Sequence, residues 1–311
     1  MSKLSIVIPV YFNELNLEDL YADLQKKVLP FLPDYELIFV DDGSQDKSYE
    51  ILVRLADSDK KIKLVKLSRN FGSHAAILAG LSHCTGDCAM MKAADLQEPS
   101  EMILDMFEKW KKGNNVVLAV RSDRQESAFQ KWFSNTYYKI MRKIAIKNMP
   151  EGGFDCFLID RKVIQVLTLM DEKNSSLMAQ ILWAGFKTDM VYYVRLEREK
   201  GKSRWTLSKK IKLFIDSILS FSYFPIRFIT GLGVFVVFVT FIYMIYILLN
   251  KFLVGIPVEG WTTLMITNLF FYGLILLTLG MIGEYLWRTF DAARSRPTYI
   301  VEEEYSKEEK R

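Results

Sequence analysis

The chain has 311 residues, enough for one large domain or two smaller ones with a buried core. Half of the residues are apolar and 14% are aromatic, which excludes a disordered polymer, and three cysteines are too few for a small disulfide-stapled scaffold. The net charge of +4 is local: residues 195–212 hold eight Lys or Arg against two acids, whereas residues 1–194 hold 25 against 26. A basic cluster beside apolar segments favours lipid headgroups or a phosphate, and we expect no nucleic-acid partner.

Short apolar runs alternate with amphipathic stretches over the first 200 residues. The predicted strands are residues 4–10, 36–42, 62–67, 88–91 and 116–120, and the predicted helices are residues 14–29, 44–56, 73–83 and 100–111. This alternation is typical of an α/β domain with a mostly parallel sheet, which we assign to residues 1–205. Ligands bind beyond the carboxyl ends of the strands in such sheets, and functional residues are expected there.

The three cysteines, Cys84, Cys88 and Cys156, do not form a metal-binding pattern. They lack a Cys-x-x-Cys pair, and only His74 and His83 could join them as soft ligands. We therefore expect buried free thiols in a reducing compartment. The first residues have a strand pattern without the features of a signal peptide, so the domain is expected in the cytoplasm.

Two long uncharged segments follow the domain. Residues 228–250 and 260–283 contain 23 and 24 uncharged residues, and each can cross a hydrocarbon core of about 30 Å. They predict two transmembrane helices within residues 226–290, at about 228–250 and 261–283. Basic residues flank the pair on its outer sides, which predicts that both termini are cytoplasmic. Apolar faces on two lone spans also make a homo-oligomer plausible.

The segments on either side of this hairpin are charged. Residues 206–225 predict an amphipathic helix, with apolar residues at 211, 214, 215, 218 and 219 and lysines on the other side. An interfacial helix fits best, and an ordinary core helix is the alternative. Residues 291–311 predict a cytoplasmic tail whose last ten residues form a solvated, frayed charge run.

Acids follow several of the predicted strands. Asp41 and Asp42 come at the end of the second strand, where they can accept hydrogen bonds from a nucleotide or can simply cap the turn. Asp95 follows the fourth strand and can hold a hard cation on a diphosphate, or can begin the next helix. Asp155 follows Gly152 and Gly153 and can accept a proton from an acceptor, or can bond its own backbone in a turn.

Basic residues gather in two places that suit a phosphate. Arg121 follows the strand at residues 116–120, and a Gly-containing loop holds Arg198, Ser203 and Arg204 immediately before the amphipathic helix. Guanidinium groups and hydroxyls at this position suit a phosphate displayed by a lipid. A generic basic flank of a membrane span is the alternative.

The ordered set IPVYFNE, VDDGSQD, LSRNFGSHAAILAG, ADLQEP, FDCFLIDRKV, REKGKSRW and IGEYLWRTFDAARSRPTYIV resembles the membrane-anchored polyprenyl-phosphate glycosyltransferases of glycosyltransferase family 2. The resemblance covers nearly the whole chain. It implies a GT-A fold and inverting transfer of a hexose from a nucleotide sugar, UDP-glucose or a related UDP-hexose, to undecaprenyl or dolichyl phosphate. It also implies a bacterial inner membrane location and a role in modifying envelope glycans.

The resemblance further implies roles for single residues. Nucleotide-sugar contacts fall on Pro9, Tyr11, Glu14, Asp42 and Asp95, with Asp95 also the ligand of Mg²⁺ or Mn²⁺. The catalytic or acceptor-orienting acid falls on Asp155. The residues implied to bind the lipid phosphate and the donor diphosphate are Arg121, Arg198, Ser203 and Arg204.

Two positions depart from the family pattern. Ala93 replaces the first acid of the Asp-x-Asp metal motif, and Phe12 is inserted in the usual Tyr-Asn-Glu. The first departure leaves open a degenerate, donor-binding membrane scaffold. A processive polysaccharide synthase is a further alternative, but Gly201 stands where such enzymes have the Gln of Gln-x-x-Arg-Trp.

Overall fold

The computed structural model describes residues 2–123, 138–139, 141–143, 145–146, 148–151, 153–170, 172, 175–196, 207–222, 224–253 and 260–307. Arg198, Ser203 and Arg204 lie outside these residues. The chain divides into two compact units. The first comprises Met1–Ser217 with Pro297–Arg311, and the second comprises Ile218–Arg296.

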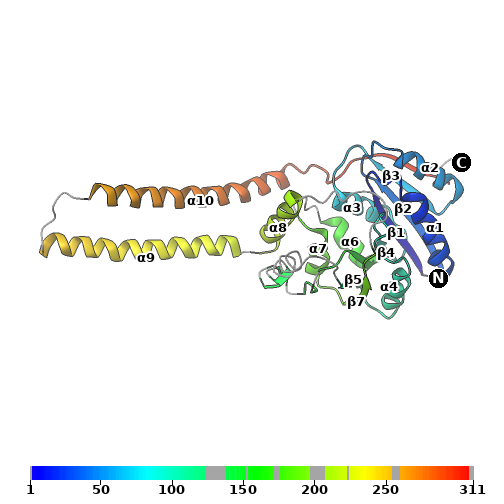
Figure 1. Ribbon diagram of the computed structural model, residues 1–311, viewed down its shortest axis with the longest axis horizontal. Helices are drawn as coiled ribbons and strands as arrows, with labels where there is room; N and C mark the ends of the chain where they lie inside the picture. Colours follow the sequence, from blue (N-terminus) through cyan, green and yellow to red (C-terminus); the bar gives the residue numbers. More distant parts are fainter. Residues whose placement is uncertain are drawn as a thin grey trace. The chain divides into compact units, whose positions relative to one another are not determined.

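An eight-stranded sheet forms the centre of the first unit (Figure 1). Its order is β7-β5-β6-β4-β1-β2-β3-β8. Neighbours from β4 to β3 run parallel, as do β5 and β7, whereas β6 is antiparallel to β4 and β5 and β8 is antiparallel to β3. The strands are β1 (Lys3–Val10), β2 (Asp34–Asp41), β3 (Ile62–Leu67), β4 (Cys88–Met91), β5 (Val116–Asp123), β6 (Cys156–Asp160), β7 (Thr188–Val194) and β8 (Val301–Ser306).

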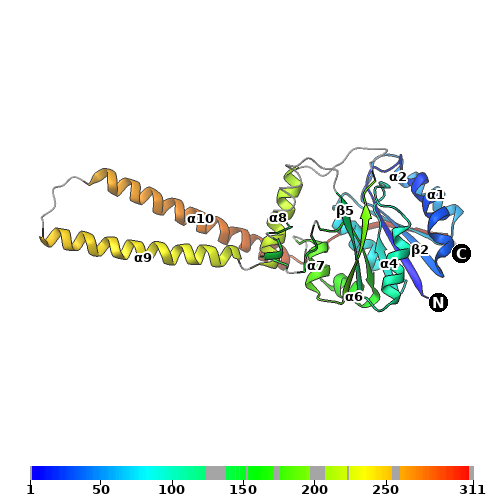
Figure 2. The same cartoon turned by 60° about the horizontal axis from the view of Figure 1, so that its bottom comes forward.

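Helices cover both faces of this sheet, which confirms the predicted α/β class (Figures 1 and 2). On one side, Lys27 at the end of α1 pairs with Glu101 before α4 at 3.1 Å. On the other, α3 and α6 contact each other and the central strands. The helices are α1 (Leu17–Lys27), α2 (Ser48–Ser58), α3 (Ser73–His83), α4 (Met102–Lys111), α6 (Arg161–Leu169) and α7 (Leu177–Trp183), with a 3-10 turn at Leu29–Phe31.

The core consists of apolar residues from the central strands, as their unbroken apolar runs predict. Leu4, Ile6, Ile8, Leu37 and Phe39 are fully buried. A strand that is covered on both faces needs such a run, because neither side meets water. The three cysteines are buried and free, as the sequence predicts.

The C-terminal segment differs from the prediction of a frayed tail. Residues 301–306 form β8, which pairs with the outer edge of β3. The strand carries three consecutive glutamates, and two of them bond basic side chains elsewhere in the first unit: Glu302 bonds Lys66 at 3.0 Å and Glu304 bonds the ring of His83 at 3.1 Å. The acidic residues of this segment therefore help to bind it to β3 and α3. The charge run alone does not predict this, because the partners are distant in the sequence.

The second unit contains two long apolar helices, α9 (Phe224–Leu253) and α10 (Trp261–Ala293), as the sequence predicts. Segments Phe224–Tyr243 and Thr267–Ala293 are long and apolar enough to cross a membrane, and neither is buried within the structure. The predicted amphipathic helix is present as α8 (Leu207–Phe221), at the junction between the two units.

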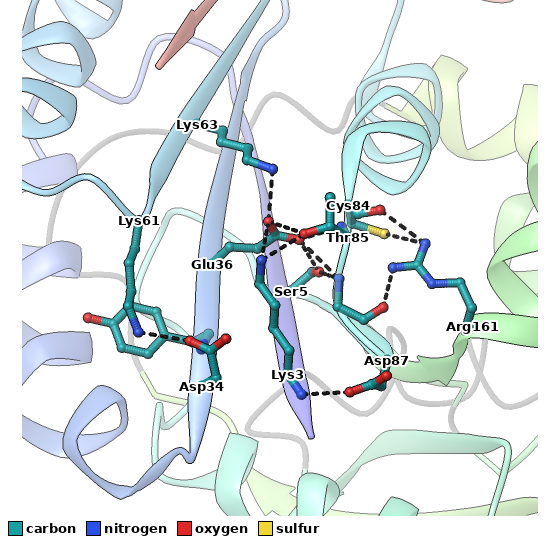
Figure 3. A network of polar contacts seen from close by, with 12 residues as sticks. Lys3, Ser5, Asp34, Glu36, Lys61, Lys63, Cys84, Thr85, Asp87 and Arg161 are labelled. Atoms are coloured by element: carbon teal, nitrogen blue, oxygen red, sulfur yellow. Dashed lines mark hydrogen bonds and ion pairs between the residues drawn. The ribbon is translucent and has the colours of Figure 1, made fainter. Parts of the chain in front are cut away.

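A buried carboxylate, Glu36, joins the amino ends of β1, β2 and β4 (Figure 3). Its side chain is 2% exposed, and its six donors are Ser5 Oγ (2.5 Å), Thr85 N (2.5 Å), Thr85 Oγ1 (2.8 Å), Gly86 N (3.2 Å), Lys63 Nζ (3.0 Å) and Lys3 Nζ (3.1 Å). Burial alone would raise the pKa of Glu36, but these donors outweigh it and lower the pKa to about 2. This network lies at the sheet edge opposite the predicted site.

Glu36→Gln should destabilise the first unit by about 3 kcal/mol, because it removes a buried charge that two lysines neutralise. Since the folded-state pKa of Glu36 is depressed, its stabilisation is present above pH 4.5 and is lost as the pH falls towards 2. Thermal unfolding from pH 7 to pH 2.5 measures both effects. Equal unfolding midpoints for the variant and the wild type at pH 7 would show that the network adds no stability.

Candidate functional site

The predicted site residues converge on one edge of the sheet. The carboxyl ends of β1, β2, β4 and β5 lie there because these strands are parallel, and antiparallel β6 brings its amino end to the same edge. The edge therefore holds the loops after β1 and β2, the loop after β4, the end of β5, and the residue before β6. These positions carry Pro9, Tyr11, Glu14, Asp42, Asp95, Arg121 and Asp155.

Hydrogen bonds tie the loop after β1 to the loop after β2. The amide of Phe12 donates to Ser44 Oγ (3.0 Å), and the amide of Asn13 donates to Ser48 Oγ (2.9 Å). Glu14 Oε2 accepts from the amide of Lys47 immediately before α2 (3.0 Å). Glu14 thus helps to hold the two loops together.

Phe12 has a left-handed backbone, with φ of +56°. This conformation is rare for a bulky residue, and strained residues of this kind cluster at functional sites. The ring of Phe12 packs edge-on against the ring of Tyr11, with their centroids 4.6 Å apart. The inserted residue is therefore built into the loop at a conformational cost, and it brings a second aromatic ring beside Tyr11.

Asp42 connects the loop after β2 to the loop after β3. Its side chain is buried, and its two oxygens accept from the amides of Phe71 (2.7 Å) and Gly72 (2.9 Å), just before α3. Burial raises the pKa of Asp42, although the two amides act in the opposite direction. Each oxygen keeps a further lone pair, with which it can accept from a ligand.

Gly43 allows these two loops to approach each other. It has φ of +70°, and a Cβ at this position would lie 2.6 Å from the backbone carbonyl carbon of Arg69. Both the left-handed backbone and the close approach of the Arg69 main chain require glycine here.

A buried ion pair between Lys92 and Glu98 connects the two ends of the loop that carries Asp95. Lys92 Nζ donates to the carbonyl oxygen of Glu98 (2.6 Å) and to its Oε2 (3.3 Å), and both side chains are buried. Burial raises the pKa of Glu98, although Lys92 opposes this effect. The amide of Gln97 donates to Asp95 Oδ1 (3.3 Å), and Leu96 has φ of +56°. These contacts hold the backbone of the loop on both sides of Asp95.

The donor set at this edge fits a metal held by one protein carboxylate. Among the residues that the structure describes, no three His, Cys, Asp or Glu are grouped as metal ligands. Glu98 and Asp155 pair with Lys92 and Arg121, whereas Asp95 lies on the loop after β4 at the carboxyl ends of the strands and stays the predicted ligand. A divalent cation bound mainly by diphosphate oxygens needs only one or two protein carboxylates.

Asp155 forms a fork with Arg121. Arg121 Nη2 donates to Oδ1 (2.6 Å), Arg121 Nε donates to Oδ2, and the hydroxyl of Tyr193 on β7 donates to the same Oδ2 (2.8 Å). Burial would lower the pKa of Arg121, but Asp155 raises it. Burial and Asp155 both raise the pKa of Tyr193, so the phenol stays protonated and can donate.

The sequence assigns Arg121 to a phosphate and Asp155 to the acceptor as separate residues, and the structure pairs them. It also adds Tyr193, which sequence reasoning missed. The only signal was the alternation in residues 188–194, which places Tyr193 on the buried face of β7 and Tyr192 on the exposed one. The roles of Arg198, Ser203 and Arg204 stay predictions, since they lie outside the described residues.

Gly43→Ala should disrupt the site, because the added Cβ meets the Arg69 main chain and the backbone conformation is strained. We expect a loss of about 2 kcal/mol of unfolding free energy and a change in the environment of Phe71. Gly113→Ala is the matched control: it shares the left-handed backbone, with φ of +86°, but its Cβ meets nothing within 4 Å. Chemical denaturation measures the unfolding free energy of both variants. Equal losses in the two variants would show that the close contact between Gly43 and the Arg69 main chain has no effect on stability.

Several known proteins are similar to this chain over almost its whole length. Residues 5–168 match the profile of Glycosyl transferase family 2. An uncharacterized glycosyltransferase of Bacillus subtilis is 39% identical, covering 99% of this chain and 95% of the relative. The bactoprenol glucosyl transferase of Shigella phage SfV is 34% identical (98% and 100%), and the prophage bactoprenol glucosyl transferase homolog of Escherichia coli is 35% identical (96% and 98%). The expected GT-A class agrees with the sheet described above, and the chain is a glycosyltransferase that belongs to Glycosyl transferase family 2.

Proposed function

We propose that this protein transfers a hexose from a UDP-sugar to polyprenyl phosphate, with inversion at the anomeric carbon. The observation that carries the proposal is the convergence of Asp42, Asp95 and the Arg121–Asp155 pair on one sheet edge. Two relatives that match almost the full chain are named for bactoprenol and for a glucosyl group, which makes glucose the first sugar to test.

The donor binds against the loops after β1, β2 and β4. Pro9, Tyr11, Glu14 and Asp42 line the nucleotide pocket, and the remaining lone pairs of Asp42 accept from the base or the ribose. Asp95 lies on the diphosphate side and is the protein ligand of Mg²⁺ or Mn²⁺. When bound, the cation stabilises the charge that develops on the departing nucleoside diphosphate.

The acceptor phosphate lies near Asp155. An oxygen of the phosphate attacks the anomeric carbon, the bond from that carbon to the diphosphate oxygen breaks, and UDP leaves with the electron pair. A phosphate monoester has a second pKa near 6 and is largely a dianion at pH 7, so its attacking oxygen needs no general base. Asp155 therefore acts on the acceptor through Arg121: its carboxylate, which also accepts from the Tyr193 hydroxyl, fixes the position of the guanidinium that donates to the phosphate.

The chain also has to bring a water-soluble donor to a lipid. The helices α9 and α10 form a membrane anchor, α8 lies at the membrane surface, and both termini with the catalytic unit are on the cytoplasmic side of a bacterial inner membrane. Arg198, Ser203 and Arg204 precede α8 in the chain, where they hold the lipid phosphate. Holding both substrates side by side supplies much of the rate enhancement.

Incubation of the purified full-length protein with polyprenyl phosphate and a panel of labelled UDP-sugars tests this proposal. We expect one labelled monosaccharide on the lipid. A labelled polymer would support a processive synthase instead, and nucleotide binding without any product would support a donor-binding scaffold. Either result would overturn the proposal.

Asp155→Asn should abolish formation of the lipid-linked sugar and leave nucleotide binding intact, because an amide has one acceptor oxygen instead of two and cannot hold the guanidinium of Arg121 in the same fork. Turnover and UDP binding are measured on the same preparation. Asp189→Asn is the matched control, since Asp189 pairs with Lys109 at the amino end of β7 (3.0 Å), away from the site. Near-normal turnover of Asp155→Asn would remove this residue from the mechanism.

Asp95→Ala should weaken metal-dependent binding of the donor by about a hundredfold, since one carboxylate contributes most of the protein's share of the cation site. Titration of UDP with and without Mn²⁺ measures this. We expect Mn²⁺ to strengthen binding to the wild type and to have little effect on the variant. If a chelator leaves wild-type turnover unchanged, a metal-free mechanism replaces this one.

A further inference from the structure

The C-terminal strand β8 reaches the loop that holds Asp42. β8 pairs with β3 from Lys63↔Ser306 to Leu67↔Val301, and the amide of Ser68 continues the pairing by donating to the carbonyl of Ile300 (3.0 Å). Figure 1 shows this strand in red along the edge of the sheet. The pairing therefore continues to the first residue after β3.

The residues that follow Ser68 contact Asp42 and Gly43, on one side of the nucleotide pocket proposed above. The guanidinium of Arg69 stacks on the ring of Phe71 at 4.0 Å, and the main chain of Arg69 lies close to Gly43. The amides of Phe71 and Gly72 hold the two oxygens of Asp42. Only two residues, Arg69 and Asn70, separate the last residue that pairs with this segment from the amide that donates to Asp42 Oδ1.

Side chains of β8 also contact the two helices that begin next to this pocket. Tyr305 Oη donates to Asp57 near the end of α2 (2.5 Å), and Glu304 bonds His83 at the end of α3 (3.1 Å), so both contacts hold these helices at the ends remote from the pocket. With the Glu302–Lys66 ion pair, β8 is fastened to β3, α2 and α3. These are the elements whose ends carry the loops around Asp42.

We propose that β8 is a positioning element for the donor: it fixes residues 68–72 and thereby the Asp42 side of the nucleotide pocket. This inference rests on the proposed donor site. Without β8, β3 would become the edge strand of the sheet, and the backbone at its end would be unpaired on one side. The amides of Phe71 and Gly72, which hold Asp42, would then sample other conformations. Only seven residues separate α10 from β8, so the same strand links the end of the second apolar helix to the donor loop.

Two truncations of the full-length chain test the proposal. A chain that ends at Arg296 lacks β8, and a chain that ends at Lys307 keeps it and serves as the control. Without β8 we expect the Kd for UDP to rise about tenfold or more, and we expect faster amide hydrogen exchange at Phe71 and Gly72. The control should match the wild type in both measurements.

A second pair of variants covers the case in which the truncated chain does not fold. The N–H groups of successive strand residues point in alternate directions, so proline at both Glu304 and Tyr305 removes at least one N–H from the pairing with β3. Alanine at both positions removes the same side chains and keeps the backbone donors. We expect the proline pair to weaken UDP binding and the alanine pair to weaken it much less.

A synthetic peptide of residues 297–307, added to the chain that ends at Arg296, should restore UDP binding. If the chains without paired β8 fold and bind UDP as tightly as the wild type, β8 is a structural edge only and the inference is wrong. If the wild type itself does not bind UDP, the proposed donor site fails instead, and the two failures are thereby distinguished.

Discussion

A carboxylate that is removed from water needs hydrogen-bond donors or a counter-charge, and the sheet edge described here depends on how these are supplied to two buried acids and to the half-buried Asp155. Asp42 accepts two backbone amides, Glu98 pairs with Lys92, and Asp155 is held by Arg121 and Tyr193. Each of these sets of contacts either joins two segments that are distant in the sequence or makes one loop more rigid. The charged residues of the proposed sugar-nucleotide site therefore also hold its loops together.

The direction of the strands explains why these groups meet. Parallel strands bring their following loops to one edge, and the antiparallel β6 places Asp155 at that edge between β4 and β5. The opposite edge carries Glu36 and its six donors, to which we assign a role in stability. The division of roles between the two edges agrees with the general rule that ligands bind at the carboxyl ends of strands in open α/β sheets.

Much of this architecture could be predicted from sequence. The apolar runs predict β1 to β5 to within a few residues, because strands buried on both faces must be continuously apolar. β8 could not be predicted, because its acids find partners only in the folded chain, and β7 is half exposed. Asp42, Asp95 and Asp155 stand out by position, whereas the Arg121–Asp155 pair and Tyr193 depend on the register of β5, β6 and β7.

The most direct test of the account is a structure of the full-length protein in a lipid nanodisc with bound UDP. The account predicts the base beside Asp42 and the residues 11–14 loop, with the diphosphate next to Asp95 and within reach of the Arg121–Asp155 pair. Nucleotide bound at the Glu36 edge of the sheet, or on any surface away from these residues, would contradict it.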